Sequence, residues 1–189
     1  MDALNLLIAD HNRVRGLFER FRKANDTHDT SSMASLASTI FTELDVHTTI
    51  EEEIFYPWAH DLSDEIGDTV DEGIQEHHVV KVLIDELGES TPGADDWVAK
   101  ITVLMENVEH HAEEEENELF PKVRSHTKAA DRNQLSERLE GRKQQLGAPV
   151  LADKIDLTED RLRELAREQA IPGRSKMDHE ELAATVSPD

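Results

Sequence analysis

The stretch His47-Thr-Thr-Ile-Glu-Glu-Glu-Ile-Phe-Tyr-Pro57 aligns without gaps on His111-Ala-Glu-Glu-Glu-Glu-Asn-Glu-Leu-Phe-Pro121. Each copy has a histidine, a glutamate four residues later (Glu51 and Glu115), and a proline ten residues later. Residues four apart lie on the same face of an α-helix. The repeat therefore predicts two helices that each direct a His and a Glu from one face.

Apolar residues recur at spacings of three and four along four segments, at about 3–24, 33–58, 64–87 and 94–123. This period is typical of amphipathic helices. Asp2 is a suitable N-cap for the first, and Pro92-Gly93 marks a loop before the fourth. Long helices with short connections predict an all-α, up-down four-helix bundle without strands.

Four histidines interrupt these apolar stripes, one on each helix. His11 precedes His47 by 36 residues, and His77 precedes His111 by 34 residues. The near-equal spacing indicates a bundle with approximate two-fold symmetry. We expect His11, His47, Glu51, His77, His111 and Glu115 at one level of its core.

Six buried polar side chains need a common partner, because each costs several kcal/mol when it has none. Imidazole suits iron, zinc, copper and nickel, and a carboxylate can bridge two hard cations. One such histidine alone is as well explained by a core hydrogen bond, but the repeated set favours a dinuclear metal site. Other metal motifs are absent: no Glu-x-x-His, no HExxH and no EF-hand loop.

Residues of about 3–126 resemble the hemerythrin-like, HHE cation-binding family. The resemblance rests on His11, His47-x-x-x-Glu51 with Phe55-Tyr56-Pro57, His77, and His111-x-x-x-Glu115 with Phe120-Pro121. It implies two non-haem iron ions, each with two histidines, bridged by the two glutamates and an oxo or hydroxo group. It further implies O2, hydrogen peroxide or nitric oxide as the small ligand.

The sequence departs from the oxygen-carrying hemerythrins at several positions. These have His-x-x-x-His on the third helix, whereas Lys81 stands four residues after His77. Their fourth helix has a carboxylate five residues after its histidine, which leaves His110 (with Glu115) and Glu116 (with His111) as alternative ligands; His78 is similarly an alternative to His77. The missing histidine favours redox reaction, sensing or catalase-like peroxide breakdown over reversible oxygen carriage.

Tyr56 is the only tyrosine of the chain. One interpretation makes it a core aromatic residue with its hydroxyl at the end of the bundle. The other makes it an outer partner or a direct phenolate ligand of iron.

Composition restricts the other functions. The chain of 189 residues has no cysteine, which excludes disulfides and thiolate metal sites. Its net charge is -22, and residues 1–126 contain 29 acidic and 9 basic residues. This excess of negative charge argues against binding of a nucleic-acid phosphate backbone by the protein as a whole. The absence of a ~20-residue apolar stretch and of a basic, apolar start predicts a cytoplasmic protein without membrane contact.

Beyond residue 126 the charge balance changes. Residues 127–152 carry three acidic and five basic residues and include a more polar fifth helix at about 129–146, which we expect either to pack on the bundle or to act as a linker helix. The sequence of residues 153–189 predicts a helix capped by Thr158 that ends at Ile171-Pro-Gly173. A short second helix capped by Asp178 follows.

This C-terminal segment resembles the Rho N-terminal or SAP-like helical motif. The resemblance implies nucleic-acid binding through basic residues, here Arg161, Arg163, Arg167, Arg174 and Lys176. A module that docks on a protein is the alternative, since the segment has a net charge of -4. Two function classes follow: a redox-active di-iron protein, or an oxygen- or iron-responsive binding module that signals through this motif without turnover.

Overall fold

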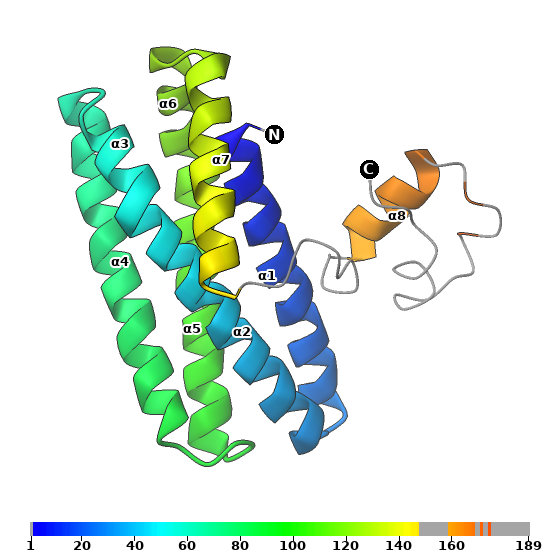
Figure 1. The fold of residues 1–189 in the computed structure, drawn as a ribbon. Coiled ribbons are helices and arrows are strands. Elements are labelled where there is room, and N and C mark those ends of the chain that lie inside the picture. The colour runs from blue at the N-terminus through cyan, green and yellow to red at the C-terminus, as the bar shows by residue number, and fades with distance from the viewer. Residues whose placement is uncertain (1, 148–158, 169–170, 172–173, 175–189) are drawn as a thin grey trace.

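The computed structural model describes residues 2–147, 159–168, 171 and 174, and within these it contains helices and no strand. In chain order the elements are α1 (Ala3–Asp26), α2 (Thr30–Ile50), η1 (Glu51–Phe55), α3 (Tyr56–His60), α4 (Asp64–Gly88), α5 (Asp95–Glu114), η2 (Glu115–Leu119), α6 (Phe120–His126), α7 (Ala129–Gln145) and α8 (Glu159–Glu168). Figure 1 shows α1, α2, α4 and α5 side by side in an antiparallel bundle, with α7 along its outside. The predicted all-α bundle is confirmed.

Local sequence explains where the bundle helices begin. Side chains of Asp2, Asp29 and Ser63 accept hydrogen bonds from backbone N–H groups at the starts of α1, α2 and α4. These N–H groups have no partner inside the helix, so each cap stabilises its helix start. The cap expected at Asp2 is thus present, with a distance of 3.0 Å to the Leu4 nitrogen.

Two π-helical turns interrupt the second and fourth bundle helices, a feature that the apolar pattern did not predict. They begin at Glu51 and Glu115, the equivalent glutamates of the repeat, and in each a backbone N–H bonds to a carbonyl five residues earlier. Each turn ends two residues before a proline, at 57 and 121. Proline lacks an N–H and crowds the carbonyl four residues before it, so a wider turn relieves the conflict.

Two apolar clusters fill the bundle above and below the level of the histidines. One contains Phe18, Phe21 and Trp97 with residues of α2, α4 and α5. The other contains Leu7, Phe55 and Phe120 and extends to α7. The polar side chains of the core lie between these clusters, away from both ends of the bundle.

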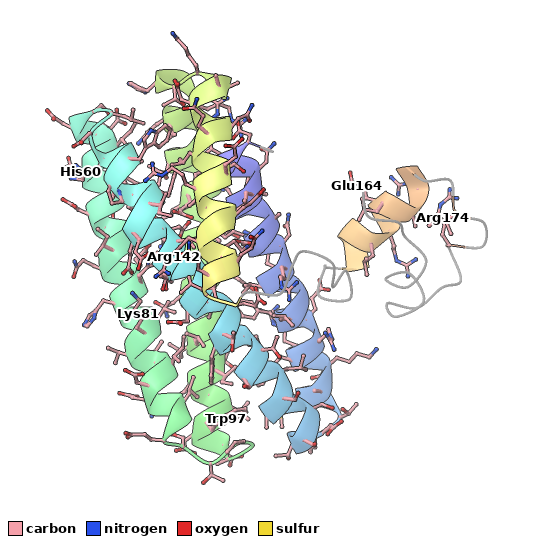
Figure 2. The ribbon with its side chains drawn as sticks, viewed as in Figure 1. His60, Lys81, Trp97, Arg142, Glu164 and Arg174 are labelled. Atoms are coloured by element: carbon pink, nitrogen blue, oxygen red, sulfur yellow. The ribbon has the colours of Figure 1, made fainter. Side chains whose placement is uncertain are left out.

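Helix α7 is part of the folded body, because it packs against α1, α2 and η1. Leu135 and Leu139 are fully or almost fully buried in the second apolar cluster. Arg142, labelled on α7 in Figure 2, adds an ion pair with Glu53 of η1, in which both carboxylate oxygens accept hydrogen bonds. The fifth helix predicted at about 129–146 is therefore found, and it packs on the bundle.

In the C-terminal segment the structure describes α8 and two further residues. Leu162, Ala166 and Ile171 are buried, and the Ile171 N–H donates to the Ala166 carbonyl at 2.9 Å. The cap expected at Thr158, the short helix expected after Asp178, and Lys176 lie outside the described residues. Among the described helices, none combines the length and apolar character needed to cross a membrane.

Candidate metal centre

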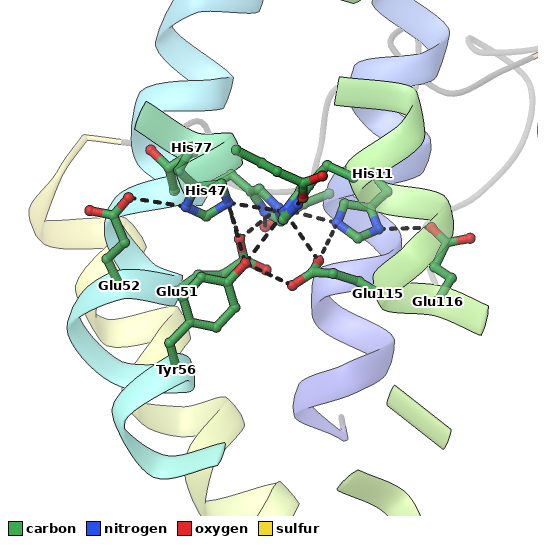
Figure 3. A network of polar contacts seen from close by, with 12 residues as sticks. His11, His47, Glu51, Glu52, Tyr56, His77, Glu115 and Glu116 are labelled. Atoms are coloured by element: carbon green, nitrogen blue, oxygen red, sulfur yellow. Dashed lines mark hydrogen bonds and ion pairs between the residues drawn. The ribbon is translucent and has the colours of Figure 1, made fainter. Parts of the chain in front are cut away.

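The six residues singled out by the repeat meet in the middle of the bundle (Figure 3). Each is buried, and none exposes more than 6% of its surface. They come from six elements and form what we call the inner cluster: His11 (α1), His47 (α2), Glu51 (η1), His77 (α4), His111 (α5) and Glu115 (η2). All four bundle helices are needed to assemble it.

The four imidazoles of the inner cluster form two pairs that face each other through Nε2. The Nε2 atoms of His11 and His47 lie 3.2 Å apart, and those of His77 and His111 lie 3.0 Å apart. Each pair comes from one helical hairpin, α1–α2 or α4–α5. The approximate two-fold symmetry of the sequence is thus present at the site.

The two glutamates cross between the pairs. Glu51 places Oε2 at 3.1 Å from His47 Nε2 and 3.3 Å from His77 Nε2. Glu115 places Oε2 at 3.3 Å from His11 Nε2 and 3.8 Å from His111 Nε2. Each carboxylate therefore contacts one imidazole of either pair, which is the placement that a bridging ligand requires.

The outer nitrogen of each imidazole faces a further carboxylate, and we call these four the outer carboxylates. Nδ1 lies 2.7 Å from Glu116 in His11, 3.0 Å from Glu52 in His77, 2.6 Å from Glu76 in His111 and 3.6 Å from Asp10 in His47. A carboxylate favours a proton on Nδ1, which leaves the Nε2 lone pair free to bind a cation. All four lone pairs then point into the inner cluster.

Cations fix three of the outer carboxylates in turn. Lys81 donates to both oxygens of Glu52 at 2.7 Å, and Arg15 donates to Glu116 at 2.8 Å. Lys143 of α7 pairs with Asp10. Lys81 stands four residues after His77, where the oxygen-carrying hemerythrins have a second histidine. It holds in place the Glu52 carboxylate that contacts His77 Nδ1.

The sequence pattern indicated Glu116 as an alternative metal ligand and did not identify the other three outer carboxylates, although the repeat contains a signal for all four. Asp10 and Glu76 each stand directly before the first histidine of a half, at 11 and 77. Glu52 and Glu116 each stand directly after an inner glutamate. Extending the repeat by one residue in each direction would have found all four.

The inner cluster fits a pair of cations. Glu51 Oε1 and Oε2 and Glu115 Oε2 are buried without a hydrogen-bond donor among the described residues, a state that costs free energy unless a cation compensates it. The donor atoms form two groups, His11–His47–Glu51–Glu115 and Glu51–His77–His111, that share Glu51. Nitrogen and oxygen donors in this mixture suit iron and related transition metals.

Burial and mutual contact shift the pKa values of these groups. Burial alone would lower the pKa of His11, but the neighbouring carboxylates of Glu115 and Glu116 raise it to about 9, whereas burial lowers the pKa of His47 to about 4. Burial and the charge of Glu115 raise the pKa of Glu51. Burial opposes ionisation of Glu115 as well, but His111 and His11 outweigh it and lower that pKa. One inner carboxylate thus carries negative charge more readily than the other.

The hydroxyl of Tyr56 faces the inner cluster and not the end of the bundle. It donates to Glu115 Oε1 at 3.0 Å and lies 3.4 Å from Nε2 of both His77 and His111 (Figure 3). The π turn explains this, because residues five apart share a face there and Tyr56 follows Glu51 by five. Burial raises the pKa of the phenol well above its usual 10.0.

Phe120 stands at the position of the repeat that is equivalent to Tyr56. Its ring stacks on His11 at 6.0 Å, as the Tyr56 ring stacks on His77 at 5.3 Å. Of these two aromatic rings, the one beside the His77–His111 pair carries a hydroxyl, and this pair also has fewer carboxylates in its group of close donor atoms.

The alternative ligands lie outside the inner cluster. His78 is exposed, and the His110 side chain, 65% exposed, lies 3.6 Å from Glu114. Glu116 takes part only as an outer carboxylate on His11. The stripe and the internal repeat selected the buried member of each pair.

An apolar pocket adjoins the inner cluster on the side of the first apolar cluster. The imidazoles of His11, His47, His77 and His111 form one wall. The rest of the lining comes from Val14, Phe18, Leu44, Val80 and Val108, together with Arg15, Thr48, Glu109 and Ala112. Its volume of about 20 Å³ is close to that of one water molecule. A diatomic or similarly small molecule matches this space.

The basic residues of the C-terminal segment are placed only in part. Arg163 and Arg174 donate to the backbone carbonyls of Arg174 and Ile171, and Arg167 is exposed. The side chain of Arg161 and all of Lys176 lie outside the described part.

Comparison with known proteins agrees with this geometry. Residues 2–123 match the model of the hemerythrin HHE cation binding domain. A protein from Nostoc sp. named DNA nickase is 28% identical over 125 residues, which cover 66% of this chain but 34% of the nickase, so the chain spans about a third of that relative. No solved structure matches. The family model covers well over half of the chain, and the core of the bundle contains buried groups of His and Glu that can hold a metal. This chain therefore belongs to the hemerythrin HHE cation-binding family.

Proposed function

We propose that the chain is a non-haem di-iron protein that binds or reacts with O2, hydrogen peroxide or nitric oxide in a redox response or in sensing. The observation that carries the proposal is the inner cluster, in which four Nε2 atoms face two buried carboxylates, and three of the four carboxylate oxygens lack a hydrogen-bond donor among the described residues. Bound iron supplies a one-electron couple and an open position for a small ligand. The apolar pocket beside the imidazoles favours a small uncharged molecule.

The ligands that we propose are His11, His47, Glu51, His77, His111 and Glu115, with Glu51 and Glu115 shared between two ions. In the structure the group of close donor atoms around His77 and His111 has one member fewer than the group around His11 and His47, and the Tyr56 hydroxyl is placed to add a donor there. The outer carboxylates orient the imidazoles, and such groups typically change metal affinity by about 10- to 100-fold.

Metal content of the purified native protein tests the proposal. We expect close to two irons per chain, falling below one in His47→Ala and in His111→Ala. His78→Ala is the matched control, because His78 is exposed beside His77 and its loss should leave the iron content unchanged. A native, fully folded protein that binds no iron would contradict the proposal.

Measurement of O2 release from hydrogen peroxide distinguishes enzymatic turnover from sensing. Iron-loaded protein that releases O2 from hydrogen peroxide over many turnovers would be a catalase-like enzyme. Loaded protein that changes its absorption spectrum with O2 or nitric oxide, but releases no O2 from peroxide, would be a binding module.

A second candidate function concerns the C-terminal segment, as a nucleic-acid- or protein-binding module that responds to the bundle. Exposed Arg167 and the name of the Nostoc relative favour nucleic acid. We expect the full chain to bind DNA and a chain without 153–189 not to bind it. DNA binding that persists after the deletion would defeat this assignment.

A further inference from the structure

A second pocket approaches the inner cluster from the opposite side to the apolar pocket, and its walls are acidic. It lies between α4 and the α5–η2 helix, has a volume of about 60 Å³, and is lined by Glu72, Glu76, Glu114 and Glu118. Tyr56 and Glu115 also line it. We call it the acidic pocket.

Glu115 connects the acidic pocket to the inner cluster. Its side chain is 4% exposed and its Oε2 has no hydrogen-bond donor among the described residues, although the residue lines the pocket. A buried carboxylate oxygen without a hydrogen-bond donor attracts a cation that enters the pocket.

Two residues that line the acidic pocket, Glu76 and Glu114, form a third group of donor atoms together with His110. Glu76, His110 and Glu114 place one donor atom each within 4.8 Å of one another, and all three are at least partly accessible. One imidazole and two carboxylates are a suitable partial ligand set for a divalent cation that keeps some of its water. Glu76 also accepts the Nδ1–H of His111 at 2.6 Å, so this group contacts an inner ligand directly.

Gly73 leaves space at the wall of this pocket. A Cβ atom at this position would lie 2.9 Å from the Tyr56 hydroxyl and 3.4 Å from His111 Cε1. The glycine therefore lets the hydroxyl stand between the pocket and the inner cluster.

Comparison with the other half of the repeat shows that the fold itself does not require Glu72, Gly73 or Glu114. Alignment of His77 on His11 places Glu72 on Leu6 and Gly73 on Leu7, and alignment of His111 on His47 places Glu114 on Ile50. Leu6, Leu7 and Ile50 are fully buried, and the helices that carry them are covered by α7. The two halves therefore have the same types of inner residue but differ at these outer positions. In the α1–α2 half the positions are apolar and covered, and in the α4–α5 half they line an open acidic pocket.

From this contrast we propose that the acidic pocket is the entry route for the metal cations, with Glu76, His110 and Glu114 as a holding site beside it. The inference rests on the proposed metal site and adds its route of loading. The apolar pocket has an accessible surface that is almost entirely apolar, although Arg15, Thr48 and Glu109 are among its lining residues. It is therefore suited to an uncharged ligand, so that cation and ligand would reach the inner cluster from opposite sides.

The rate of metal uptake tests the route. Chelator-treated full-length protein is mixed with Co²⁺, and uptake is followed by absorption in a stopped-flow instrument. Glu72→Gln/Glu118→Gln and Glu114→Gln should each slow uptake about tenfold, since acidic funnels accelerate cation association by 10-fold or more. Glu106→Gln/Glu113→Gln is the matched control, because it removes two exposed charges of α5 away from the pocket and should leave the rate unchanged.

The final stoichiometry separates this inference from the proposed function. Two Co²⁺ per chain, reached slowly in the pocket variants and at the normal rate in the control, would support the route. Two Co²⁺ per chain at the same rate in all proteins would overturn it while leaving the metal site intact. Failure of the unmodified protein to bind Co²⁺ would overturn the proposed function itself.

The holding site has its own readout. Protein whose inner cluster is already filled is titrated with Mn²⁺, and free Mn²⁺ is measured by electron paramagnetic resonance. We expect one further, weak Mn²⁺ per chain, lost in His110→Gln and retained in His78→Gln. A further site that survives His110→Gln, or no further site in the unmodified protein, would remove the holding site from the proposal.

Discussion

At the scale of single residues, Tyr56 and Phe120 break the symmetry of the site. They occupy equivalent positions after the two π turns and stack on His77 and His11 respectively. Only Tyr56 brings a hydroxyl to the inner cluster. We therefore expect the two ion positions to differ in affinity and in spectrum.

Tyr56→Phe makes both halves alike and tests this difference. If the phenol ligates iron, the oxidised protein should lose a visible phenolate-to-iron charge-transfer band, and the affinity for one of the two ions should fall by about tenfold. Absorption spectra and iron titration measure these effects. A band that persists in Tyr56→Phe would show that the phenol is not a ligand.

The inner residues could be predicted from the sequence, whereas their surroundings could not. His11 and His77 were visible because each interrupts an apolar stripe, and Glu51 and Glu115 because they repeat. The contacts of Asp10, Glu52, Glu76 and Glu116 join different helices, so they depend on how the helices are rotated against each other. The position of the Tyr56 hydroxyl depends on a π turn. The spacing of apolar residues over a single helical turn does not tell a π turn from an α-helical turn.

At the scale of elements, α7 reaches the metal centre although it lies outside the part that matches the family. Lys143 pairs with Asp10, which faces His47 Nδ1 at 3.6 Å. Burial would raise the pKa of Asp10, but His47 and Lys143 outweigh it and lower it. The fifth helix thus contributes charge to the centre as well as covering the bundle.

Lys143→Met should destabilise the metal-free protein by about 3 kcal/mol, because it leaves a buried carboxylate without its cation. Since the pKa of Asp10 is lowered by folding, this contribution is complete above its ordinary value of 3.8 and is lost as the pH falls through the folded value. The difference between variant and unmodified protein in urea unfolding should therefore be full at pH 7 and shrink below about pH 4.

Lys122→Met is the control for this experiment. Lys122 pairs with Glu65 on the surface, where 75% of the Glu65 side chain is exposed, so its loss should have little effect. Equal unfolding curves for Lys143→Met and Lys122→Met at pH 7 would contradict a role for the Lys143–Asp10 pair.

At the scale of the whole molecule, the bundle contains a polar layer between two apolar clusters. A layer with buried carboxylates weakens the metal-free bundle, and a bound cation should stabilise it by about 4 kcal/mol when its concentration is 1,000 times the dissociation constant. For a chain of this length we expect chelation to lower the Tm by about 10 °C. Calorimetry with and without chelator measures this shift, and equal Tm values would contradict it.

Glu51→Gln provides the matching control. The neutral amide removes the repulsion between Glu51 and Glu115, so the metal-free variant should melt above the metal-free unmodified protein. The same variant should gain much less stability from metal, because a bridging carboxylate has been lost.

The crossing of the two glutamates has a consequence for how the chain could be divided. Each hairpin supplies both imidazoles of one pair, yet each carboxylate contacts an imidazole of the other hairpin. A backbone cut at 61–63, between α3 and α4, would give two fragments of which neither contains a complete set of donors. Reassembly of such fragments would be driven by the cation, which would act as a cross-link whose strength is set by the metal concentration.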